Sequence, residues 1–185
     1  MATRAFSDEE MSRLRGFPEI TDDELIGSFI LTSADRAFVD PGRGRPARDR
    51  LGLAIQLCTL SWLGFVPDDV TTGPPAVVAR LAGQLRLDVE VLAGYGDRKQ
   101  TRTDHLRLVL DYSGWRPARH LELKELEEFL LARAMEHDSP TLLFRLACEH
   151  LRTSRVVRPG PVVLVERVAA ARARSGRPMT ASPIS

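Results

Sequence analysis

The sequence predicts an all-α fold: a helical bundle built from two helix-turn-helix-like units and buttressing C-terminal helices. Helix-capping motifs recur along the chain, and apolar residues repeat every three or four positions. Only residues 162–165 show something of the two-residue alternation of a half-buried strand. With 185 residues, 43% of them hydrophobic and 28% charged, the chain fits one sizeable domain or two small ones.

Three capping boxes mark helix starts in the first third of the chain. In each box a Ser or Thr is followed three residues later by an acid, so that side chains and backbone satisfy one another's hydrogen bonds. The pairs are Ser7 with Glu10, Thr21 with Glu24 and, more weakly, Thr32 with Asp35. The Pro- and Gly-rich residues 41–46 end the third helix.

Residues 47–63 predict a buried central helix. Leu51, Ile55, Cys58 and Trp62 keep a spacing of three or four residues, and neighbouring leucines widen the apolar stripe. We expect these four side chains to be buried together, because they define one face of a helix.

A second group of helices follows the loop at residues 64–73. Pro74-Pro75 opens a helix that we expect to bury Val78 and Leu81, since proline is favoured at a helix start. Asp88 is placed to cap a short helix after it.

The third helix of this group follows a turn at Gly94-Tyr95-Gly96. Thr101 and Asp104 form a further capping box, ahead of a helix that we expect to bury Leu106 and Val109. Two short helices, a glycine turn and a third helix together predict a helix-turn-helix.

These elements divide the chain into four expected segments. Residues 1–69 form the first helical unit, and residues 74–138 form the second, which ends in an acidic-faced helix. Residues 139–176 form C-terminal helices that begin at the N-cap Ser139, and residues 177–185 form a disordered tail.

Several classes of protein are excluded by what the sequence lacks. Cys58 and Cys148 lie in apolar runs without metal-ligand spacing, so we expect reduced thiols rather than a disulfide or a zinc site. No segment has the length and apolarity of a membrane span or a leader, which predicts a cytoplasmic protein without membrane contact. The common nucleotide-binding, zinc-protease and hydrolase motifs are missing, so we expect no catalytic residue, cofactor or metal.

The basic residues are clustered, although the net charge is only +1. All of them except Lys99 and Lys124 are arginines, which suit phosphates and guanine edges. The first cluster surrounds the start of the helix at residue 47, where cations oppose the helix dipole unless an anion such as phosphate is bound. Pairing with Asp40 and Asp49 on a solvated loop is an equally weighted alternative. The cluster consists of Arg43, Arg45, Arg48 and Arg50.

The second cluster lies at the start of the helix expected at Thr101. Its members are Arg98, Lys99, Gln100, Arg102, Thr103 and Arg107. In a recognition helix, Arg102, Thr103 and Arg107 would reach base edges, Arg98 and Lys99 would suit phosphates, and Gln100 would suit adenine. A solvated helix start is the alternative, and His105 fits a packing role better than that of a general base.

A third basic cluster in the C-terminal helices includes Arg155 and Arg158, for which phosphate contact or simple solubility both remain open. The acidic residues of the helix before it fit a solvated face rather than a metal site. They are Glu122, Glu125, Glu127 and Glu128.

The order of several segments resembles the amino-terminal region of Tn-three family transposases, over about the first 175 residues. The segments include Leu14-Arg15-Gly16-Phe17-Pro18, Arg50-Leu51-Gly52-Leu53-Ala54-Ile55-Gln56-Leu57, Ala82-Gly83-Gln84-Leu85, Thr101-Arg102-Thr103-Asp104-His105 and Arg158-Pro159-Gly160. The resemblance implies helical units that bind double-stranded DNA at the terminal inverted repeats of a transposon. It also implies that the acidic, metal-binding catalytic part of the family lies outside this chain.

We therefore expect a non-enzymatic, sequence-specific DNA-binding module of a transposase. The alternative is a helical interaction or assembly domain, in which acidic and basic blocks bind a second copy of the chain or other transposase regions without direct DNA contact.

Overall fold

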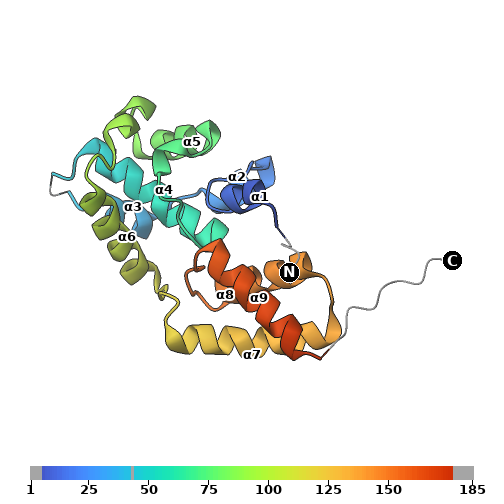
Figure 1. Cartoon of the computed structure of the whole chain (residues 1–185). Coiled ribbons are helices and arrows are strands. Elements are labelled where there is room, and N and C mark those ends of the chain that lie inside the picture. Colours follow the sequence, from blue (N-terminus) through green and yellow to red (C-terminus); the bar gives the residue numbers. More distant parts are fainter. Residues whose placement is uncertain (1–5, 43, 177–185) are drawn as a thin grey trace. The chain divides into compact units, whose positions relative to one another are not determined.

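The computed structural model describes residues 6–42 and 44–176, and the regular elements of this part are all helical (Figure 1). The expected all-α fold is therefore confirmed. The chain forms two compact units. We call residues 12–116 the middle unit, and residues 1–11 with 117–185 the terminal unit. The tail expected at residues 177–185 lies outside the described residues.

The middle unit is organised around one central helix. Its helices are α2 (Asp22–Ser28), α3 (Ser33–Val39), α4 (Ala47–Leu63), α5 (Pro75–Leu85) and α6 (Lys99–Ser113), with the 3-10 turns η1 (Val70–Thr72) and η2 (Val89–Gly94). All of the others pack against α4. Because α4 is surrounded, its residues 51–60 are buried on every side of the helix, as is Trp62.

The expected core of α4 is confirmed. Leu51 and Ile55 are fully buried, and Cys58 and Trp62 are buried with them. In the second group Val78, Leu81 and Val109 are buried, whereas Leu106 is only half-buried. Burial raises the pKa of the Cys58 thiol to about 12, so this cysteine is an inert core residue.

The three capping boxes form as expected. The Thr21 hydroxyl accepts from the backbone N–H of Glu24, whose carboxylate accepts from the N–H of Thr21 at 2.9 Å. The same exchange occurs in the Thr32 and Ser7 boxes. These boxes fix the entry of the chain into three short helices.

Polar side chains tie the first helices of the middle unit to α4 and α5. The indole N–H of Trp62 donates to Glu24 Oε1 at 3.2 Å. Gln84 of α5 donates to the carbonyl of Phe29 and accepts from the N–H of Leu31, both at 2.9 Å. Arg80 of α5 also donates to the carbonyl of Phe29 at 2.9 Å, so two side chains of α5 bind the backbone of the segment between α2 and α3.

The terminal unit contains three helices that pack on one another: α7 (His120–Glu136), α8 (Pro140–Thr153) and α9 (Pro161–Arg174). Helix α1 (Asp8–Arg13) crosses the division at residues 11 and 12. The core includes Leu126, Leu130, Leu143, Leu151 and Leu164. Ser139 caps α8 as expected, by accepting from the N–H of Leu142 at 3.2 Å.

The compact units do not follow the segment limits expected from the sequence. The limit expected at residues 69–74 runs through the middle unit, where α5 packs on α4. The acidic helix α7 packs with α8 and α9. Packing does not show which segments fold independently, so the four-segment organisation stays a prediction. Among the described residues, no helix is long and apolar enough to span a membrane.

Candidate nucleic-acid interface

An arginine just before α4 caps the C-terminal end of the preceding helix, α3. Arg45 Nη1 donates to the backbone carbonyls of Phe38 and Val39, at 2.9 and 2.7 Å. These carbonyls belong to the last two residues of α3, where a helix leaves carbonyl groups unpaired and favours a cation. Arg45 therefore holds the end of α3 against the start of α4.

The other arginines of this cluster differ in their surroundings. Arg50 Nη1 lies 2.7 Å from Asp40 Oδ2. The pKa of Asp40 is held down first by the backbone N–H of Gly42 and then by Arg50. Arg48 lies 3.9 Å from Asp49, and its side chain is 54% exposed. Pairing inside the fold thus applies to Arg50, while Arg48 extends outward, and Arg43 lies outside the described residues.

The N-cap of α6 lies three residues earlier than the sequence indicated. This N-cap is Arg98 and the first residue of the helix is Lys99, so the capping box expected at Thr101 is wrong. Asp104 instead accepts from the side-chain amide of Gln100 at 2.9 Å. The Asp104 carboxylate is therefore bonded to a side chain inside the helix, and it does not accept from the backbone N–H of Thr101 as a capping box requires.

The earlier start exposes a run of polar side chains in the first turns of α6. Arg98, Lys99, Gln100 and Thr103 are exposed. Arg107 is 69% exposed and lies 3.6 Å from Asp104. These five residues present donors and acceptors to the outside of the middle unit.

Arg102, in contrast, is held within the fold. Its Nη1 donates to the backbone carbonyl of Asp68 at 2.8 Å. Its aliphatic stem lies against Gly96, where φ is 76° and a Cβ would come within 2.6 Å of Arg102 Cδ. Glycine at position 96 therefore allows both the left-handed turn and the close approach of Arg102.

Tyr95 joins the starts of α4 and α6. Its buried ring lies on Gly52 of α4, where a Cβ would come within 2.2 Å of Tyr95 Cε2. Its hydroxyl lies 3.0 Å from His105 Nδ1 of α6. Arg48 lies beside Gly94, just before this tyrosine. The two basic helix starts of the middle unit are therefore brought close together.

His105 has the packing role that its sequence context favours. Burial lowers the pKa of His105, Asp49 and Asp104 raise it, and Arg45 lowers it. Burial also raises the pKa of the Tyr95 phenol. A neutral imidazole bonded to a neutral phenol is a satisfied internal pair rather than a proton-transfer site.

The predicted residues of the C-terminal helices lie in the terminal unit. Arg155 is exposed and has a left-handed φ of 52° just after α8. Arg158 is half-buried, and a hydrogen bond joins its guanidinium to Cys148. Burial lowers the pKa of Arg158 and raises that of Cys148. Arg158 is thus partly a packing residue, and Arg155 extends outward.

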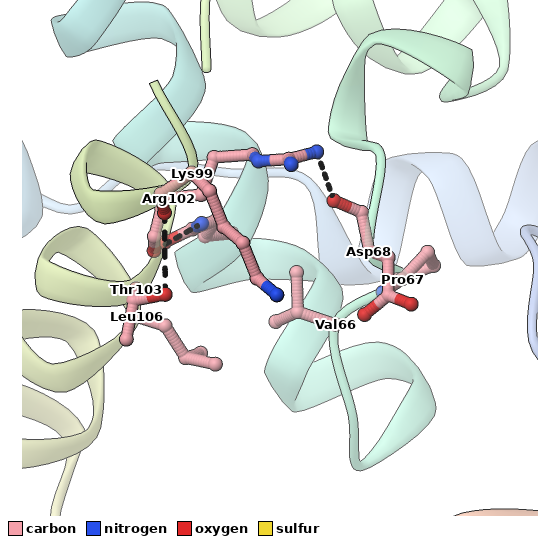
Figure 2. Close-up of a pocket in the computed structure, with 8 residues that line it drawn as sticks. Val66, Pro67, Asp68, Lys99, Arg102, Thr103 and Leu106 are labelled. Atoms are coloured by element: carbon pink, nitrogen blue, oxygen red, sulfur yellow. Dashed lines mark hydrogen bonds between the residues drawn. The ribbon is translucent and has the colours of Figure 1, made fainter. Parts of the chain in front are cut away.

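The structure adds a cavity that the sequence analysis missed. It has a volume of about 350 Å³ between α4, α6 and the segment after α4. Figure 2 shows Lys99 extending from α6 toward the segment that carries Val66, Pro67 and Asp68. In the sequence, the cavity was indicated only by Gln56, a polar residue within the apolar run of α4. The lining residues are Gln56, Val66, Pro67, Asp68, Lys99, Arg102, Thr103 and Leu106.

Comparison with known proteins identifies the family of the chain. Residues 6–171 match the family model described as "Domain of unknown function (DUF4158)". The chain belongs to this family. It is also 32% identical over 162 residues to the transposase for transposon gamma-delta of Escherichia coli strain K12, with 86% of the chain aligned. It is 33% identical over 166 residues to the transposase for transposon Tn2501 of Escherichia coli, with 89% aligned.

A third relative of this DUF4158 chain is the transposase for transposon Tn501 of Pseudomonas aeruginosa, 30% identical over 168 residues. The expected resemblance to the amino-terminal region of Tn-three family transposases is confirmed. The chain spans 16% of the length of the first two relatives and 17% of the third. Transposition is therefore an activity of much longer proteins.

Several residues in the segments that carry this resemblance have defined positions in the DUF4158 fold. Gly52 gives room to the ring of Tyr95, and Gln84 binds the backbone between α2 and α3. His105 pairs with Tyr95, and Gln56 lines the cavity. The resemblance thus includes residues that position α4 and α6 relative to each other.

Proposed function

We propose that this chain is the DNA-binding module of a Tn-three family transposase and recognises the terminal inverted repeats of a transposon. The observation that carries the proposal is the exposed polar run at the start of α6, together with the exposed Arg48 of α4, which lies beside Gly94 in the turn before α6. The relatives, which are named as transposases for particular transposons, support the choice of DNA as partner.

In this proposal α6 is the recognition helix of a helix-turn-helix, with η2 and the turn at residues 94–96 before it. Gln100, Thr103 and Arg107 are the exposed residues suited to base edges. Arg98 and Lys99 contact phosphates as the helix enters the groove.

The remaining predicted residues take other parts in the proposal. Arg48 contacts a phosphate at the start of α4, and Arg155 contacts one from the terminal unit, because both side chains extend outward. Arg102 acts mainly by holding α6 to the carbonyl of Asp68. Arg45 and Arg50 hold the loop between α3 and α4, which also carries the proposed phosphate contact Arg43.

A second candidate function is assembly with another copy of the chain or another part of a transposase. It is favoured by exposed apolar side chains in the terminal unit. Leu121 is 60% exposed and Met135 is 64% exposed, both on α7, and Val162 on α9 is 44% exposed. Such side chains are typical of protein-interaction surfaces when they form a patch.

Fluorescence anisotropy with an inverted-repeat duplex and a scrambled duplex, at two salt concentrations, tests the main proposal. We expect tighter binding to the inverted repeat, and an affinity for both duplexes that falls as salt rises. Equal affinity for the two duplexes would remove sequence recognition. An absence of binding, together with self-association in sedimentation, would favour the assembly function.

A further inference from the structure

An exposed carboxylate lies beside the start of α6. It belongs to Asp68, in the segment after α4, which lines the cavity together with Lys99 of α6. Arg102 of α6 donates to the backbone carbonyl of Asp68 at 2.8 Å. The backbone of Asp68 is therefore tied to the helix that we propose as the recognition helix.

The neighbouring acid, Asp69, has a structural role that Asp68 lacks. The carboxylate of Asp69 accepts from the backbone N–H and the hydroxyl of Thr71, at 3.0 and 2.6 Å, and thereby caps η1. Within residues 6–42 and 44–176, no donor is bonded to the carboxylate of Asp68. The oxygens of Asp68 are thus available to a ligand of the middle unit.

A carboxylate at this place restricts which part of DNA approaches it. It repels phosphates, and in the major groove it needs a base edge that offers a donor. Guanine presents two acceptors there, thymine presents an acceptor and a methyl group, and adenine presents an acceptor beside its amino group. Cytosine presents its amino group alone, and it is the base whose amino group Asp and Glu side chains bind.

Lys99 lowers the electrostatic cost of bringing this carboxylate near DNA. Its ammonium group lines the same cavity, and Figure 2 shows Lys99 extending toward the segment that carries Asp68. Because opposite charges on facing elements partly offset each other, the approach of DNA to the exposed cations of α6 remains favourable.

We infer that Asp68 is a specificity-determining residue, which accepts a hydrogen bond from the amino group of one cytosine in the DNA site. The inference rests on the proposed DNA-binding function and extends it, because the segment after α4 then recognises a base alongside α6. Cytosine at this position supplies the donor that the carboxylate needs. Another base leaves the carboxylate desolvated without that donor, which disfavours unrelated DNA.

Selection of bound duplexes from a random-sequence library, with the full chain and its variants, tests the inference. The wild type should enrich a motif that contains a cytosine–guanine pair, and Asp68→Ala should enrich the same motif without a preference at this pair. Asp68→Asn should shift the preference there toward adenine, because an asparagine side chain pairs with both the amino group and the ring nitrogen of adenine. The remaining positions of the motif report that the variants are folded.

The matched control is Asp69→Asn. It removes the same charge from the next residue and keeps a side chain that caps η1, so the motif should be unchanged. A change equal to that of Asp68→Asn would overturn the inference, because loss of charge alone would then explain both results.

A modified cytosine locates the contact on the base. Cytosine methylated on its amino group still pairs with guanine, but the methyl group replaces the hydrogen that faces the major groove. This base should weaken binding of the wild type about tenfold and should not affect Asp68→Ala. Equal losses in the two proteins, or the same motif in the wild type and both Asp68 variants, overturns the inference while the proposed function stands. If the wild type enriches no motif, the proposed function fails, and the inference fails with it.

Discussion

The starts of α4 and α6 carry the same sequence signature but different structural roles. At α4, Arg45 binds the last carbonyls of α3 and Arg50 pairs with Asp40. At α6, Arg98 and Lys99 are exposed. The difference lies in what the cations of each start contact: Arg45 and Arg50 reach the last carbonyls of α3 and the carboxylate of Asp40, whereas Arg98 and Lys99 stay exposed after the glycine turn. Cations bound inside the fold, such as Arg45, are therefore less available to an anion than exposed ones such as Arg48 and Lys99.

Disturbing Tyr95, which connects the starts of α4 and α6, should have the largest effect on stability. Gly52→Ala places a methyl group in the ring of Tyr95, whereas Gly83→Ala on α5 meets no atom within 4 Å. Both changes gain helix propensity, so their difference isolates the ring contact. We expect Gly52→Ala to be less stable than Gly83→Ala by about 2–4 kcal/mol.

Urea unfolding of the two variants and the wild type measures this difference. Equal stabilities would show that Tyr95 moves away at little cost and does not fix the distance between the two starts. The Tyr95–His105 bond should also be lost in Gly52→Ala, which a change in the His105 ring signals would report.

The sequence predicted the helices better than the roles of the arginines. Capping boxes at Ser7, Thr21 and Thr32 are local, because both partners lie within four residues, and all three formed. The start of α6 was misplaced because Asp104 pairs with Gln100, a competing local bond. A capping-box pattern therefore predicted the helix start correctly where its acid had no second side chain nearby to bond with.

Long-range partners explain most of what the sequence missed. Arg102 bonds a carbonyl 34 residues away, and Gln56 bonds one 46 residues away. Neither contact has a periodic pattern or a charge pair to indicate it. The cavity likewise depends on the segment after α4 approaching α6, which only the folded chain establishes.

Removing the Arg45 guanidinium should destabilise the fold, in contrast to removing an exposed arginine of the same cluster. Arg45→Met leaves the carbonyls of Phe38 and Val39 without their donor, and should cost about 1–3 kcal/mol of unfolding free energy. The matched control is Arg48→Met, whose side chain is largely exposed and should change stability by less than about 0.5 kcal/mol. Equal losses in denaturant unfolding would show that the two arginines have the same role.

The exposed cations of α6 should show the opposite behaviour. Arg98→Gln and Lys99→Gln should leave stability within about 0.5 kcal/mol of the wild type, because both side chains are exposed. Each should lower the slope of log affinity against log salt by about one, for cognate and unrelated duplexes alike, if it contacts a phosphate. The slope should be unchanged in Lys124→Gln, and a slope unchanged in all three variants would remove α6 as a phosphate contact.

The smallest expected effect is a dependence of stability on pH through His105. This residue of α6 bonds Tyr95, whose ring lies on Gly52 of α4. Burial lowers the pKa of His105 in the folded protein, so the unfolded chain takes up this proton first as pH falls. The contribution of the neutral ring to stability is complete above the pKa of histidine in the unfolded chain, about 6.5. It is lost as pH falls from that pKa toward the lowered pKa of the folded protein.

His105→Gln, which keeps a partner for the Tyr95 hydroxyl but does not titrate, should therefore show a smaller fall in Tm than the wild type between about pH 7.5 and 5.5. His120→Gln controls for the loss of a histidine at an exposed position of α7. If His105→Gln and the wild type lose the same Tm over this range, Asp49 and Asp104 offset the burial of the ring, and the pair with Tyr95 joins α4 to α6 equally well in either protonation state.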